Sequence, residues 1–224
     1  MKTNLHFWMA ASLSLLFCAG ARAQENEPRS MPDSVYYLMP SFGQGVVYIT
    51  GQSPAQGKLN ICAVDHTLRF LDKDGKELEA SDQESITMVR ISGVLFVQDR
   101  HEFYRMHPLT EEIGVAVLRT VKVIRDVKPG AYGTTSQTTA VREYGSLYAD
   151  GVNYQLGSEI KSYPYTVSET FFLYQGHDIM ALNKKNLRKL FPQKKDEINA
   201  WFKEGHSLPD TLSETLELLS GWLQ

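Results

Sequence analysis

The sequence predicts an α+β fold, in which an antiparallel, curved or barrel-like β-sheet is followed by a C-terminal segment of three helices. Three observations lead to this prediction. Short segments rich in β-branched and aromatic residues follow one another from Val35 to Val127, and turn residues separate several of them. Asp74-Gly75 lies between two such segments, as in a tight hairpin. After residue 182 the apolar residues recur instead at helical spacing.

The first 23 residues have the pattern of a secretory signal peptide, with Lys2, an apolar run over 9–19 and small residues at Ala21 and Ala23. We expect cleavage after Ala23, which gives a mature chain that starts at Gln24. The alternative is lipid attachment at Cys18. That reaction requires a small residue before the cysteine, and Phe17 occupies the position.

The mature chain keeps 21 basic and 26 acidic side chains, a net charge of −5, because only Lys2 and Arg22 leave with the signal peptide. A mildly acidic chain without a basic block is not typical of nucleic-acid binding. No later apolar run approaches the roughly 18 residues of a membrane span. Only Cys62 survives processing, which excludes an internal disulfide bond.

The expected strands of the first region have clear limits, and they span 45–50, 57–64, 67–71, 85–91, 93–99 and 113–124. Cys62 falls in the second strand, where a buried, inert thiol is the favoured interpretation. The alternative pairs Cys62 with His66 as nucleophile and base. A strand separates them by about 13 Å, so this pair requires a turn at Asp65. A calcium loop around Gly75 is rejected because Phe70 and Ser81 would occupy ligand positions.

The domain organisation follows from changes in composition. Residues 24–127 form a β-rich domain, and the Gly, Ser and Thr of 128–141 indicate a loop or linker. Residues 142–224 hold a smaller β region and the helices, either as a second unit or packed with residues 24–127 as one domain.

Three helices are expected at the C-terminus, each with one apolar face. Asn183 is a plausible cap for the first, which ends before Pro192, and Gly205 can close the second. Thr211 and Glu214 have capping-box spacing at the start of the third. The apolar faces need a surface to pack on, and the nearest one in the chain is the preceding sheet. The expected apolar residues are Leu187, Leu190, Phe191, Ile198, Trp201, Phe202, Leu212, Leu216, Leu219 and Trp222.

A resemblance covers most of the mature chain. The segments over 57–98, "KPGAYGTTSQTTA" (128–140) and "LNKKNLRKLFPQKKDEINAWFKEG" (182–205) resemble uncharacterised exported proteins of Bacteroidota, with a β-rich region, an AYGxTSxT loop and a terminal FPxKKxxI helical segment. The resemblance implies the periplasm or cell surface of a Gram-negative bacterium, and it transfers no catalytic residue. It also implies O-glycosylation at Asp-Ser/Thr-apolar triplets, which Ser34 and Thr211 satisfy; Thr211 is alternatively only a helix cap.

No group of residues has the spacing of a catalytic or metal centre, and we expect no cofactor. His101 and His107 would lie about 20 Å apart on one strand, too far to share a metal ion. His177 beside Asp178 is typical of a turn. The acidic pair Glu111-Glu112 also lies on an expected turn, where adjacent side chains diverge.

Tyrosines are the most suggestive remaining feature, since seven of the 11 fall between residues 132 and 174. Ordinary sheet packing accounts for such residues. Flat amphipathic rings also suit recognition of a glycan or a protein partner. Two classes of function are therefore retained: a non-enzymatic cell-envelope binding module, and a hydrolase with a dispersed active site. The candidate binding residues are Tyr144, Tyr148, Tyr154, Tyr163 and Tyr165.

Overall fold

The structure is a computed structural model that describes residues 31–123 and 164–223, together with the backbones of four short strands between them. The predicted signal peptide and most of the predicted loop lie outside the described residues. Within 128–141 the backbone forms the paired strands β9 (Lys128–Pro129) and β10 (Thr135–Ser136). A second pair of backbones, β11 (Ser146–Ala149) and β12 (Val152–Gln155), follows.

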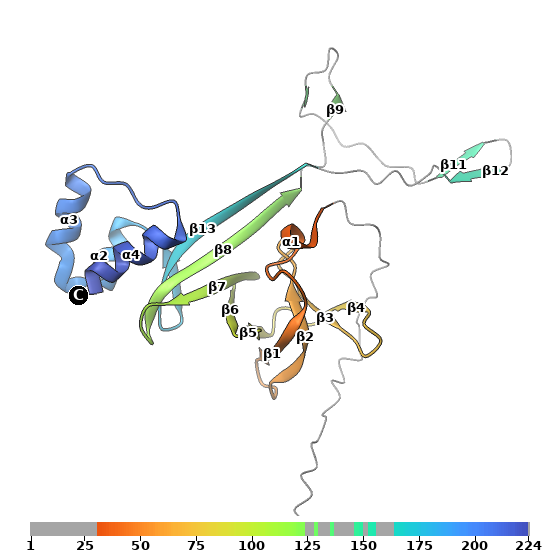
Figure 1. The fold of residues 1–224 in the computed structure, drawn as a ribbon, viewed down its shortest axis with the longest axis horizontal. Coiled ribbons are helices and arrows are strands. Elements are labelled where there is room, and N and C mark those ends of the chain that lie inside the picture. Colours follow the sequence, from red (N-terminus) through yellow and green to blue (C-terminus); the bar gives the residue numbers. More distant parts are fainter. Residues whose placement is uncertain are drawn as a thin grey trace, which may run out of the picture.

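One antiparallel sheet of ten strands organises the described chain, in the order β14-β13-β8-β7-β6-β5-β1-β2-β3-β4 (Figure 1). A short helix, α1 (Asp33–Tyr36), precedes it. The strands are β1 (Gly43–Ile49), β2 (Ala55–Ile61), β3 (Leu68–Leu71), β4 (Glu77–Glu79), β5 (Ile86–Ile91), β6 (Val94–Asp99), β7 (Glu102–Pro108), β8 (Ile113–Val123), β13 (Tyr165–Gln175) and β14 (Asp178–Ala181).

The prediction of an α+β fold with an antiparallel sheet is confirmed, but a barrel-like or strongly curved sheet is wrong. The sheet is open, and the two end strands β14 and β4 do not pair within the described residues. A barrel covers its apolar face with its own opposite wall. Here the C-terminal helices supply that cover over β8 and β13, so closure is not needed.

The helices pack on the sheet as expected. They are α2 (Lys184–Leu190), the 3-10 turn η1 (Pro192–Lys194), α3 (Lys195–Lys203) and α4 (Leu212–Leu223). The Asn183 side chain accepts the Asn186 N–H at 2.9 Å, which confirms the predicted cap. Gly205, at φ 88°, follows the end of α3. Leu187, Ile198 and Leu219 are fully buried with Val115 and Leu173 of the sheet.

The first half of the sheet has a core of its own. Side chains of β1, β2, β3, β5, β6 and β7 form one buried cluster, and it includes Ile61, Val89, Phe96 and Phe103. The Asp74-Gly75 turn joins β3 to β4, with Gly75 at φ 78° and Asp72 Oδ1 accepting two backbone N–H groups. The expected strand limits did not include β4 and β7, although a strand was considered for the segment that holds His101 and His107.

Candidate binding surface

A two-stranded arm projects from the sheet, because β8 and β13 are longer than their neighbours (Figure 1). β7 pairs with β8 only over 114–118, and β14 pairs with β13 only over 172–175. We call residues 119–123 and 165–170 the arm. Antiparallel pairing of β8 with β13 holds the arm together, and its register places Val121 opposite Val167 and Val123 opposite Tyr165.

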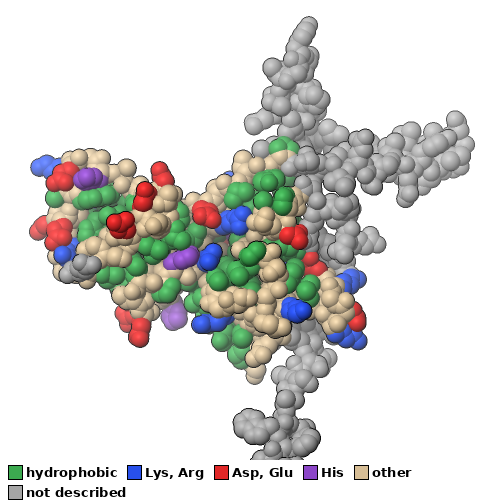
Figure 2. Space-filling model, in the orientation of Figure 1, with side chains coloured by type: hydrophobic (Ala, Val, Ile, Leu, Met, Phe, Trp, Pro, Cys, Tyr) green, Lys and Arg blue, Asp and Glu red, His purple; other side chains and the backbone are tan. Residues whose placement is uncertain are grey.

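The two faces of the arm differ in chemistry. Directly opposite residues of a β-ladder share a face, so Val121, Val123, Val167 and Tyr165 lie on one side. Thr120, Lys122, Thr166 and Ser168 lie on the other. Val167 is 43% exposed and Tyr165 is 36% exposed, and they are two of the three large hydrophobic residues that the described chain leaves open to solvent. Hydrophobic side chains accordingly reach the surface over the arm (Figure 2).

The outer edge of β13 is also open. Among the described residues no strand pairs with the segment 165–171 on the side away from β8. Edge strands usually carry lysine, proline or a bulge that prevents pairing with another chain. This edge reads Tyr-Thr-Val-Ser-Glu-Thr-Phe, with Glu169 as its one charged residue. It therefore offers backbone donors and acceptors to an added strand.

The base of the arm is bonded to the N-terminal half of the chain. The Val121 N–H donates to the Ala63 carbonyl at 3.1 Å. The Arg119 guanidinium donates to the backbone carbonyls of Ser34, at 3.1 Å, and Tyr37, at 3.5 Å. Met31 and Ala63 pack against Val121. These contacts fix the direction in which the arm projects.

A buried polar network lies next to this junction. Arg69 is 2% exposed and forms ion pairs with Asp65 at 2.8 Å and Glu79 at 2.9 Å, while its Nε donates to the Thr67 hydroxyl. Burial alone would raise the pKa of Asp65, but hydrogen bonds from Thr67 and Cys62 and the charge of Arg69 lower it. Both carboxylates therefore pair with the Arg69 guanidinium, and the network stabilises the β2–β3 connection.

Cys62 is fully buried next to this network, which confirms the prediction that its thiol is buried. Burial and then the charge of Asp65 raise the pKa of its thiol to about 11. A thiolate is the reactive form of cysteine, so this thiol is a poor nucleophile at neutral pH. The chain does turn at Asp65, but His66 is used elsewhere: its Nδ1 accepts the Phe103 N–H at 3.3 Å.

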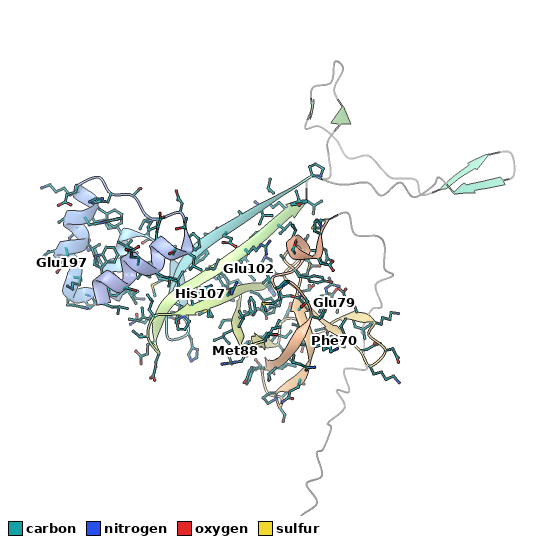
Figure 3. The ribbon with its side chains drawn as sticks, viewed as in Figure 1. Phe70, Glu79, Met88, Glu102, His107 and Glu197 are labelled. Carbon is teal, nitrogen blue, oxygen red and sulfur yellow. The ribbon has the colours of Figure 1, made fainter. Side chains whose placement is uncertain are left out.

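The other histidines that the structure describes are not grouped as metal ligands. His101 lies in the β6–β7 turn at φ 65°, and His107 lies further along β7 (Figure 3). In the described ranges, no three histidine, cysteine or acidic side chains are placed to hold a metal ion. Glu111 and Glu112 are exposed in the β7–β8 connection. No helix in the part of the chain that the structure describes has the length and hydropathy to cross a bilayer.

A shallow cavity of about 280 Å³ lies between the β6–β7 turn, the β13–β14 turn and α2. His177 and Asp178 line it with Asp99, Arg100 and Lys189. Asp99 and Arg100 form a loose ion pair at 3.7 Å, and the Arg100 side chain is 85% exposed. Opposite charges in an open, hydrated depression offer little discrimination between ligands.

The structure places one predicted binding residue, Tyr165, on the exposed arm. The backbones of Tyr148 and Tyr154 lie in β11 and β12, and their side chains lie outside the described residues. Tyr144 and Tyr163 fall wholly outside them. Sequence reasoning missed Val167, although the alternation of β13 carried that signal. Ser34 and Thr211 are both exposed, and the Thr211 hydroxyl accepts the Glu214 N–H as a cap.

Comparison of the chain with protein-family models, with curated proteins and with solved structures gave no match.

Proposed function

We propose that the protein is an exported, non-enzymatic binding module of the bacterial cell envelope, and that its arm takes up an extended segment of a partner protein as an additional strand. The observation that carries the proposal is the open edge of β13 over 165–171, with exposed Val167 and Tyr165. Strand addition at a sheet edge gives affinity through main-chain hydrogen bonds and specificity through alternate side chains.

The two faces of the arm define the partner segment. An added strand would place alternate side chains beside Val167 and Tyr165 and the remaining ones beside Thr166 and Ser168. The best partner is a segment of about seven residues that alternates apolar and hydroxyl-bearing side chains. A basic side chain near Glu169 would add charge complementarity.

Binding is favoured over hydrolysis by the state of the candidate catalytic groups. Cys62 is a buried thiol whose pKa is raised, and the acceptor nitrogen of His66 already accepts a backbone N–H.

The predicted signal peptide supports the envelope address, and the intact mass of the exported protein tests it. We expect the mass of residues 24–224; a lipid-modified Cys18 at the N-terminus would contradict it.

An array of seven-residue peptides that alternate apolar and hydroxyl-bearing residues tests strand capture directly. We expect wild-type protein to retain a subset, and N-methylation of alternate peptide amides to abolish retention because it removes the donors. Val167→Lys should weaken retention by about tenfold or more, since a charged edge resists pairing. Leu223→Lys is the matched control, because Leu223 is 36% exposed on a helix far along the chain.

Two outcomes would contradict strand capture. One is the absence of retention for every peptide. The other is retention that neither N-methylation nor Val167→Lys reduces. A parallel glycan array covers the other partner class: retention there that Tyr165→Ala eliminates would replace the peptide by a glycan. The double substitution Tyr148→Ala with Tyr154→Ala tests the predicted contribution of β11 and β12.

A further inference from the structure

The β2–β3 connection, residues 62–67, is bonded to three other elements. The Ala63 N–H donates to the carbonyl of Tyr36, the last residue of α1, at 2.7 Å. The Ala63 carbonyl accepts the Val121 N–H at the base of the arm. The third bond runs to β7, where the Phe103 N–H donates to His66 Nδ1 at 3.3 Å. The connection thus holds the arm against the first half of the sheet.

His66 is an unusual residue for this role. It is 8% exposed, and its backbone lies in the left-handed region at φ 54°. Because Nδ1 accepts a hydrogen bond, the neutral ring carries its proton on Nε2. That Nε2 is buried and has no hydrogen-bond partner among the described residues. The hydrogen bond from Phe103 therefore requires the neutral ring, with its proton on Nε2.

We propose that His66 is an acid-sensitive latch, which in its neutral form ties the β2–β3 connection to β7 and which protonation opens. A proton on Nδ1 would turn the acceptor into a donor that faces the Phe103 N–H, so the hydrogen bond is lost and two donors meet in a buried site. Leaving the site also relieves the left-handed backbone at this residue.

The charged groups around His66 oppose this effect but do not cancel it. Two carboxylates raise the pKa of His66 through their charge: Glu102, at the start of β7 (Figure 3), and Asp65, in the connection itself. Both carboxylates already have partners: Glu102 accepts the Tyr104 hydroxyl at 2.9 Å, and Asp65 pairs with Arg69. Burial lowers the pKa of His66 more than these carboxylates raise it, so the neutral ring is favoured in the fold.

The latch has a consequence for the arm. Opening the connection removes the Ala63 carbonyl from Val121, and with it the backbone bond that fixes the base of the arm. A loosened arm would hold an added strand less well at acidic pH. This last step rests on the proposed function, whereas the latch itself does not.

Amide hydrogen exchange measured by NMR at pH 7.5 and at a pH below the midpoint of the His66 ring titration tests the latch without any ligand. After correction for the intrinsic pH dependence of exchange, we expect the Phe103 and Val121 amides to lose protection at the lower pH. The amides of Val115 and Leu173, under the helices, should keep theirs. Unchanged protection at Phe103 and Val121 would overturn the latch.

His66→Asn is the matched variant, since asparagine tolerates the left-handed backbone, offers Oδ1 in place of Nδ1 and does not titrate. It should remove the pH-dependent loss, and an equal loss in this variant would overturn the proposal. His107→Gln is the control, because burial and Arg105 also lower the pKa of His107. It should leave the loss at Phe103 intact; if it abolishes the loss, the response belongs to His107.

A titration of the His66 ring protons in the wild-type protein covers the case in which His66→Asn does not fold. We expect a midpoint below 6.5, with the Phe103 amide shift moving in step. A midpoint at or above 6.5, or an invariant Phe103 signal, would overturn the latch. None of these readouts involves a partner, so a failed peptide array and a failed latch are distinguishable.

Discussion

Replacing Leu219 by alanine tests whether the C-terminal helices are an integral part of the fold. Leu219 is fully buried in α4, among Val115, Val117 and Leu173 of the sheet and side chains of the other helices. Leu223 lies one turn further along the same helix and is 36% exposed. The two residues allow the same chemical change to be made inside and outside the core.

The expected magnitude follows from burial. Truncating a fully buried leucine removes its transfer free energy and leaves a cavity, and such changes typically cost about 3–4 kcal/mol. For a chain of this size that corresponds to a fall of about 6–16 °C in Tm. Leu223→Ala should reduce the free energy of unfolding by less than about 1 kcal/mol, because the side chain is already partly hydrated.

Urea unfolding measured with two probes makes the assay specific. Trp201 and Trp222 are the only tryptophans after the predicted signal peptide, so fluorescence reports on the helices, while the reactivity of the buried Cys62 thiol reports on the first half of the sheet. We expect both probes to give one transition and Leu219→Ala to shift both. Equal midpoints for the two variants, or separate transitions for the two probes, would refute the argument and make the helices a detachable appendage.

Three further predictions concern individual residues. Gly114→Ala should lower the free energy of unfolding by at least about 2 kcal/mol, because a Cβ there meets the His107 carbonyl and the Tyr174 ring. Gly57→Ala is the control for the same chemical denaturation experiment. It should be close to neutral, because the Cβ added there meets only Leu59, at 3.6 Å. Acid should destabilise the fold as the pH falls below 3.8, because the pKa of Asp65 is lowered in the fold and its ionised carboxylate contributes stability above that pH. Asp65→Asn should flatten that part of the curve of unfolding free energy against pH. An unchanged curve would contradict the role of Asp65. Cys62, with a thiol pKa of about 11, should resist alkylation in the native protein and react fully in denaturant, so rapid native labelling would show the thiol to be accessible.

Much of the local structure was predictable from the sequence because its causes are local. Alternating apolar and β-branched residues predicted the strands that became β1, β5, β6 and β8 to within one or two residues. The Asp74-Gly75 turn depends on the φ freedom of glycine, and the Asn183 cap on a side chain three residues from its donor. Helical spacing identified the buried faces of α2, α3 and α4.

Some strands carry no such local signal. β4 has three residues, too few for a pattern to show. β7 alternates poorly because Phe103 and Tyr104, which are adjacent, are both buried, one on each side of the sheet. Their strand state depends on neighbours on both edges. Non-local pairing of this kind cannot be read from a window of a few residues.

The candidate surface depends still more on tertiary structure. The pairing of β13 with β8 joins residues more than 40 positions apart, and the excess length of both strands is what exposes Val167 and Tyr165. Composition drew attention to tyrosines, of which Tyr165 is the one whose side chain the structure describes on the arm. Whether an edge is open depends on which strands pair elsewhere.

The sequence by itself determined the class of fold, the order of its parts, the hairpin turn, the caps and the burial of Cys62, because short-range sterics, hydrogen bonding and hydrophobic periodicity set each of these. Only the tertiary structure decided that the sheet stays open, that Arg69 is buried between Asp65 and Glu79, and that His66 serves β7 instead of Cys62. Those outcomes depend on which distant segments meet. A buried charge or a neutral histidine is stable only once its partners have been brought together.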